Sequence, residues 1–94
     1  MSNFLLTSYH TLDTIARHCP TALSTYIVCV GRSNDVGQVT LKKYQIVDEI
    51  GDSWAKFNNN LRRLYREGVL EYHRMDDMLQ ITLTPDEMAD ADIH

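Results

Sequence analysis

Residues 42–70, KKYQIVDEIGDSWAKFNNNLRRLYREGVL, decide how this chain folds. Their hydrophobic spacing predicts two helices joined by a tight turn. At about 100° per residue, Phe57, Leu61 and Leu64 of the second helix share one stripe, which predicts its buried side. The side directly opposite carries one small residue, one amide and two guanidinium groups, with no carboxylate: Ala55, Asn59, Arg62 and Arg66.

The outward side of this second helix has the chemistry needed to contact DNA. An Asn side chain can pair bidentately with adenine, and an Arg side chain can pair with guanine or a phosphate. The same residues also suit an ordinary solvated face, because Arg and Lys are mostly exposed in folded proteins. The helix face alone leaves these two interpretations equal, so the surrounding architecture has to decide between them.

Glycine, serine and threonine residues mark the ends of these two helices. Gly51 stands where a helix commonly ends in the left-handed conformation, and Ser53 is a natural N-cap. Gly68 closes the second helix, which we expect over residues 53–67. We expect the first helix to begin near residue 41, capped by Thr40, with these apolar residues on its inner side: Leu41, Tyr44, Ile46, Val47 and Ile50.

The segment before residue 41 predicts two further helices and a short strand. An i, i+4, i+7 pattern indicates an amphipathic helix over residues 8–18. Pro20 suits the first position of a central helix over residues 20–30, which Gly31 ends. A short strand is expected over residues 38–40.

The C-terminal part predicts a hairpin and an acidic end. Residues 69–75 and 78–83 have the pattern of two strands around a two-aspartate turn. Residues 85–94, expected as a short helix or tail, carry a charge of −4, which equals the net charge of the whole chain. Residues 38–75, in contrast, carry seven basic and five acidic residues, a surplus of +2. Residues 38–75 thus have only a small excess of positive charge with which to attract a nucleic acid.

Length and composition predict one small cytoplasmic domain. A chain of 94 residues has room for one core, and burial on folding reaches only ~60–65% of the unfolded surface. The sequence has no run of ~18 apolar residues and lacks the features of a signal peptide, so we expect no membrane partner. Cys19 and Cys29 match no metal-binding spacing, and we interpret them as reduced thiols with Cys29 in the core.

Catalytic and metal-site patterns do not occur in the sequence. The four histidines show neither H-x-x-H nor H-E-x-x-H spacing. Ser24 and Ser53 lack the glycines of a nucleophile elbow. We therefore expect no enzyme, no metal site and no cofactor. Trp54 is expected to be a half-buried packing residue rather than a base-stacking wedge, because Trp buries a large area.

The order of the expected elements resembles that of the winged helix-turn-helix domain. Residues 46–70 are also similar, without a gap, to the pattern of small bacterial, phage and plasmid members of this family. The matching positions are Gly51, Ser53, Phe57, Leu61, Leu64, Gly68, Val69 and Leu70. The resemblance implies a mainly α fold with a small antiparallel β hairpin: a three-helix core, a wing and an extra N-terminal helix. The domain would span residues 1–84, followed by the acidic end over 85–94.

Two residues depart from the family pattern. Asp52 stands where the family usually has an apolar turn residue, so it brings a negative charge close to an expected phosphate. Asn60 replaces the usual Ala at the flank of the buried stripe. It either forms a hydrogen bond inside the fold or is exposed because the neighbouring helix lies further away.

The resemblance also implies which residues contact DNA. Helix 53–67 would enter the major groove, and the wing near His73 would lie over the adjacent backbone or minor groove while contributing little. The implied DNA-binding residues are Lys42, Lys43, Ser53, Ala55, Lys56, Asn58, Asn59, Arg62, Arg63, Arg66 and Arg74. Winged helices of this size usually act as dimers, and the apolar N-terminal helix would supply the dimer interface: Phe4, Leu5, Tyr9 and Leu12.

Two functions fit these expectations. The first is sequence-specific binding of double-stranded DNA by a homodimer, as a transcriptional repressor or as a phage or plasmid replication or partition factor. The alternative is a protein-interaction module of the same fold, an adaptor or inhibitor of another nucleic-acid machine that no longer binds DNA. Asp52, the acidic end and the small basic surplus favour the alternative, whereas the carboxylate-free outward side of helix 53–67 favours DNA.

Overall fold

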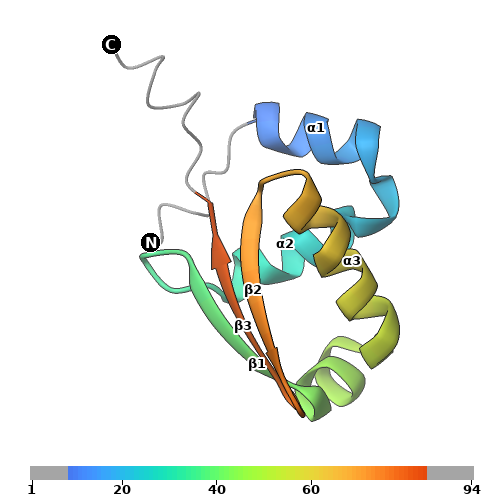
Figure 1. Ribbon diagram of the computed structural model, residues 1–94, viewed down its shortest axis with the longest axis vertical. Coiled ribbons are helices and arrows are strands. Elements are labelled where there is room, and N and C mark those ends of the chain that lie inside the picture. Colours follow the sequence, from blue (N-terminus) through green and yellow to red (C-terminus); the bar gives the residue numbers. More distant parts are fainter. Residues whose placement is uncertain (1–8, 85–94) are drawn as a thin grey trace.

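The computed structural model describes residues 9–84, which form an α+β fold with helices on one side of a three-stranded antiparallel sheet (Figure 1). Within these residues, no helix combines the length and the apolar character needed to cross a membrane. The expected acidic end over residues 85–94 lies outside the described part of the chain, as do Phe4 and Leu5. The elements follow in the order α1 (Tyr9–His18), η2 (Pro20–Ala22), α2 (Leu23–Arg32), β1 (Gln38–Lys42), η3 (Gln45–Ile50), α3 (Trp54–Arg66), β2 (Leu70–Met75) and β3 (Met78–Leu83).

The sheet has β3 at its centre, paired antiparallel with β1 on one side and β2 on the other. Ile81 of β3 lies opposite both Val39 and Tyr72, and Leu79 lies opposite Arg74. Directly opposite residues share a face of the sheet, so the buried leucines and isoleucine of β3 point to the same side as Tyr72 and Arg74. The hairpin of β2 and β3 confirms the hairpin expected from the sequence.

The face of α3 that packs on the core is the face predicted from its hydrophobic spacing. Phe57, Leu61 and Leu64 are all 0% exposed. Asn60, at the flank of this stripe, is buried, and its Nδ2 donates a hydrogen bond to Thr25 Oγ1 at 3.0 Å. Of the two alternatives for Asn60, the structure therefore has the internal hydrogen bond, which links α3 to α2.

The central helix differs from the expectation at both ends. Residues Pro20–Ala22 form a separate 3₁₀ turn, and the α-helix begins only at Leu23. Gly31 does not end the helix, which continues to Arg32. It ends at Ser33, whose extended backbone (ψ 154°) leaves the helix while its hydroxyl donates to the carbonyl of Val30 at 2.9 Å. A serine cap that satisfies a terminal carbonyl thus ends the helix in place of a glycine.

The helix expected from residue 41 is shorter and wound differently. Leu41 belongs to β1, so Thr40 caps no helix, and residues Gln45–Ile50 form a π-type turn. A π-turn closes i→i+5 hydrogen bonds, so residues three apart no longer share one side. Tyr44 and Val47 are accordingly 55% and 45% exposed instead of lining the core.

Candidate functional site

Helix α3 has well-defined ends that fix how its outward side is presented. Ser53 caps it, and its Oγ accepts a hydrogen bond from the backbone N–H of Lys56 at 3.0 Å. Gly51 and Gly68, on either side of the helix, both have the left-handed conformation, with φ of 82° and 77°. The residues predicted to face outward are all exposed: Ala55, Asn59, Arg62 and Arg66.

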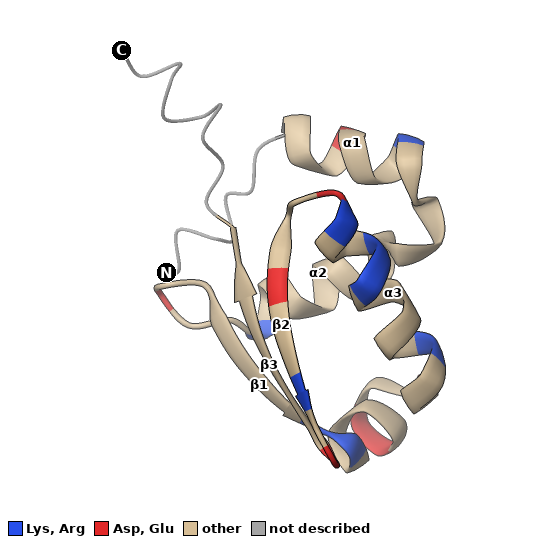
Figure 2. Ribbon diagram, in the orientation of Figure 1, with Lys and Arg blue, Asp and Glu red and all other residues tan. Residues whose placement is uncertain are grey.

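The nine Lys and Arg residues divide into two groups by their partners. Arg17, Arg32 and Lys56 form ion pairs with Asp13, Glu49 and Asp52, and Arg63 donates to a threonine hydroxyl. The remaining five have no carboxylate oxygen within 4.0 Å anywhere in residues 9–84. We call these five the unpaired cations: Lys42, Lys43, Arg62, Arg66 and Arg74. All five belong to the predicted DNA-binding set, and Figure 2 shows basic residues on α3, on β2 and at the end of the sheet beside η3.

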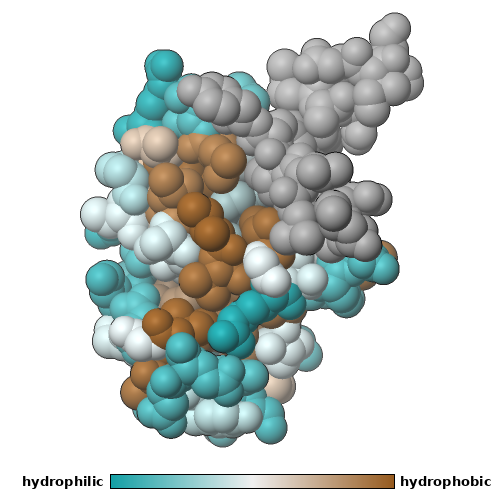
Figure 3. Space-filling model, turned by 180° about the vertical axis from the view of Figure 1, so that it is seen from behind, coloured by the Kyte–Doolittle hydropathy of each residue, from teal (hydrophilic) through white to brown (hydrophobic). Residues whose placement is uncertain are grey.

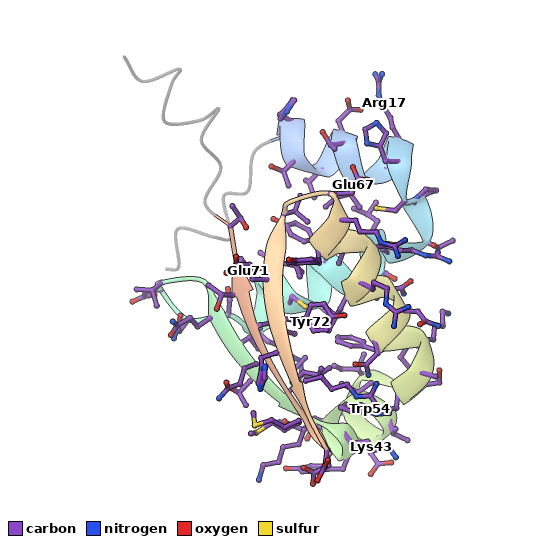
Figure 4. The ribbon with its side chains drawn as sticks, in the orientation of Figure 1. Arg17, Lys43, Trp54, Glu67, Glu71 and Tyr72 are labelled. Carbon is purple, nitrogen blue, oxygen red and sulfur yellow. The ribbon has the colours of Figure 1, made fainter. Side chains whose placement is uncertain are left out.

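Two of the unpaired cations meet at the aromatic ring of Trp54. Lys43 Nζ lies 5.9 Å from the ring centroid of Trp54, and Arg74 Cζ lies 5.8 Å from it. Trp54 is half-buried and packs against the core, as its size predicted. In Figure 4, Lys43 and Trp54 lie together at the start of α3, next to the hairpin turn. This cluster is not predictable from the sequence, because nothing local connects the start of η3 with the end of β2.

The start of α3 is less open to an anion than the family pattern implies. Asp52 Oδ1 accepts the backbone N–H of Ser53 at 2.9 Å and lies 3.9 Å from Lys56 Nζ. The N–H groups of Ser53 and Lys56 therefore already have partners inside the chain. The carboxylate of Asp52 lies beside the start of α3, and its negative charge opposes the attraction of this helix end for a phosphate.

The other predicted DNA-binding side chains on α3 are directed elsewhere. Asn58 is half-buried, and its Nδ2 donates to the Trp54 carbonyl at 2.8 Å. Its Oδ1 is buried without a hydrogen-bond partner among the described residues. Arg63 donates to Thr21 Oγ1 at 2.6 Å and so links α3 to η2. The structure does not bring Asn58 and Arg63 to the outward stripe.

Helix α1 packs on its own chain. His18 Nδ1 lies 2.7 Å from Glu67 Oε1, which connects the end of α1 to the end of α3. Leu12 is half-buried against the core. Phe4 and Leu5 lie outside the described residues, and so does the side chain of Tyr9, so the dimer interface stays a prediction.

An apolar surface lies on the side of the molecule that faces away from the viewer in Figure 1. The sequence did not predict this surface. Figure 3 shows hydrophobic residues gathered on this reverse side, where α2 lies. On α2, Ile27 is 54% exposed, and Leu23 and Val30 are only partly buried. The predicted central helix had apolar residues over most of its circumference, which was the signal for such a surface.

The cysteines are structural. Neither forms a disulfide, and both are buried, which confirms the expected core position of Cys29. Burial raises the pKa of the Cys29 thiol to about 12. Burial also raises the pKa of Cys19, with a further rise from the nearby charge of Glu67 that Arg63 opposes. Over residues 9–84, no group of three His, Cys, Asp or Glu side chains is placed to hold a metal ion.

Comparisons with protein-family models, with curated proteins and with solved structures give no match. The features of this chain that bear on its function are the exposed side of α3 and the unpaired cations.

Proposed function

We propose that this protein is a winged helix-turn-helix protein that binds double-stranded DNA, with α3 as the recognition helix and the β2–β3 hairpin as the wing. The order α2, β1, η3, α3, β2, β3 supports this proposal because it agrees with the order of elements in that family. The observation that carries it is the exposed, carboxylate-free side of α3, together with the five unpaired cations among the described residues.

The chemistry of α3 suits a major groove. An α-helix with side chains is ~10–12 Å across and the groove is ~12 Å wide, so the helix can enter with its outward side against the base edges. Ala55 permits close approach, and Asn59 reads adenine by two hydrogen bonds. Arg62 reaches guanine or a phosphate, and Arg66 contacts the backbone.

A second copy of the chain completes the proposed assembly. A homodimer would read two half-sites about one helical turn apart, which suits a transcriptional repressor or a phage or plasmid replication or partition factor. The proposed dimer contacts are the four residues expected from the sequence: Phe4, Leu5, Tyr9 and Leu12.

The proposal is tested by selecting binding sequences from random duplexes and then measuring fluorescence anisotropy with the selected and a scrambled duplex. Asn59→Ala should lower the preference for the selected sequence by ~1–3 kcal/mol, because a bidentate base contact is lost. Arg62→Ala should lower affinity for both duplexes, or for the selected one if Arg62 contacts a base.

Arg17→Ala and Arg32→Ala are the matched controls, because they remove the same charge from residues that are ion-paired away from α3. If the Arg62→Ala and Arg32→Ala proteins bind with equal affinity, α3 is not the DNA-contacting element. A wild-type protein that binds no duplex at low salt rules out the function.

A protein-interaction module is the second candidate, and the apolar surface of α2 is the observation that favours it. Ile27 is more than half exposed on that helix. Under this alternative, Ile27→Ser should abolish capture of a partner protein while Arg62→Ala leaves it intact, and no variant should bind duplex DNA.

A further inference from the structure

We propose that Lys43 and Arg74, positioned by Trp54, form a binding site for the nucleic-acid backbone in which each cation holds one phosphate. This inference rests on the proposed DNA-binding function and names the place where the wing and the recognition helix hold the backbone together. The site would bind a phosphodiester, independent of base sequence.

The two cations reach one aromatic ring from separate parts of the chain. Lys43 follows β1, Arg74 is on β2 and Trp54 is the first residue of α3. Their charged groups lie 5.9 and 5.8 Å from the ring centroid. At this distance a cation is attracted to the negative face of an indole, so the ring holds each of the two side chains beside it.

The backbone around this cluster is also fixed. The N–H of Lys43 donates to the carbonyl of Asp77 at 2.7 Å, which ties the start of η3 to the turn of the hairpin. Arg74 lies opposite Leu79 in the sheet, on the face that packs toward the helices. Holding the two side chains in advance lowers the entropy cost of ordering them on a ligand.

Both cations are available for an anion. Neither has a carboxylate oxygen within 4.0 Å in the described part of the chain, although Asp76 and Asp77 are exposed in the neighbouring turn. Asp52, two residues before Trp54, is instead engaged by the Ser53 N–H and faces Lys56. Arg presents a planar pair of donors to a phosphate and Lys a compact point charge, so each is able to hold a phosphate.

The site also replaces the phosphate position that the family pattern implies. At the start of α3, the carboxylate of Asp52 lies beside the helix N-terminus and satisfies the Ser53 N–H. This carboxylate disfavours an anion there, whereas Lys43 and Arg74 place two positive charges beside the ring of Trp54. In this proposal, the backbone phosphates are held by Lys43 and Arg74 instead of by the N-terminus of α3.

Trp54 is the single tryptophan of the 94 residues, so its fluorescence reports directly on the proposed site. We expect duplex DNA to produce a saturable change in Trp54 emission at the same concentrations that produce binding by anisotropy. Lys43→Ala and Arg74→Ala should each lower affinity about eightfold at ~0.1 M salt and reduce the salt slope by ~0.9, as expected for one phosphate contact.

Arg17→Ala is the charge-matched control, because Arg17 is ion-paired with Asp13 on α1 and is not one of the proposed DNA contacts. It should leave the Trp54 emission change intact. Trp54→Leu retains both cations, so it should lower affinity severalfold with an unchanged salt slope, and Trp54→Phe should restore much of the loss. Thermal unfolding of each variant verifies that it is folded at the assay temperature.

The outcomes separate the site from the function. If duplex binds but its affinity for Lys43→Ala and Arg74→Ala equals that for Arg17→Ala, this site is refuted while DNA binding stands. If Trp54→Leu binds as tightly as the wild type, the positioning role is refuted. Inorganic phosphate is the second probe, with chloride at equal ionic strength as its control. If phosphate alone produces a saturable change in Trp54 emission and chloride does not, the site binds a free anion. That result would overturn the assignment to a backbone phosphate. A wild-type protein that binds no duplex overturns both proposals.

Discussion

The unpaired cations predict how steeply salt should weaken DNA binding. If each of the five contacts one phosphate, log K should fall against log salt with a slope of about −4.5 per protomer, from ~0.9 per contact. Between ~50 and ~200 mM salt, this slope corresponds to a loss of about 500-fold in affinity. A symmetric homodimer doubles the number of phosphate contacts, so by the same relation its slope should be about −9.

Arg66→Ala tests this count most directly. Arg66 is in the last turn of α3, exposed and without a carboxylate partner in residues 9–84, so its loss should reduce the slope by ~0.9 per protomer. Arg17→Ala should leave the slope unchanged, because Arg17 pairs with Asp13 at 3.0 Å on α1. The measurement is fluorescence anisotropy of a labelled duplex over a salt series.

Two results would refute this reasoning. A wild-type slope shallower than about −2 would mean that most of the unpaired cations contact no phosphate. Equal slopes for Arg66→Ala and Arg17→Ala would mean that carboxylate pairing does not decide which cations bind DNA.

Three further substitutions test the fold by urea unfolding. Asn60→Ala should lower the free energy of unfolding by ~1–3 kcal/mol, because Thr25 Oγ1 is left buried without its donor; a loss below ~0.5 kcal/mol would show that water replaces it. Ser53→Ala should cost ~1 kcal/mol through the lost cap to the Lys56 N–H, whereas Ser53→Asp should retain the stability. Gly51→Ala should cost ~1–2 kcal/mol from its φ of 82° alone, since an added Cβ meets no atom within 4 Å; an unchanged stability would mean that the turn relaxes.

Much of the candidate site could be predicted because it depends on local rules. The buried stripe of α3 and the exposed stripe opposite follow from helical periodicity, and both agree with the structure for Phe57 and Arg62. The two glycines and Ser53 also act on residues only a few positions away in the chain. The sequence did not distinguish which of the nine Lys and Arg side chains have partners, because those partners come from other elements.

The amino-acid sequence by itself determined the ends of α3, its buried side and the hairpin, since each depends on neighbours within a few residues. The tertiary structure decided three other features: the extension of β1 beyond Thr40, the bond of Asn60 to α2, and the meeting of Lys43 and Arg74 at Trp54. Strand β1 continues because β3 lies beside it to accept pairing, and such a neighbour is set by long-range packing. The cation cluster exists because the start of η3, the first turn of α3 and the end of β2 converge, which spacing along the chain does not encode.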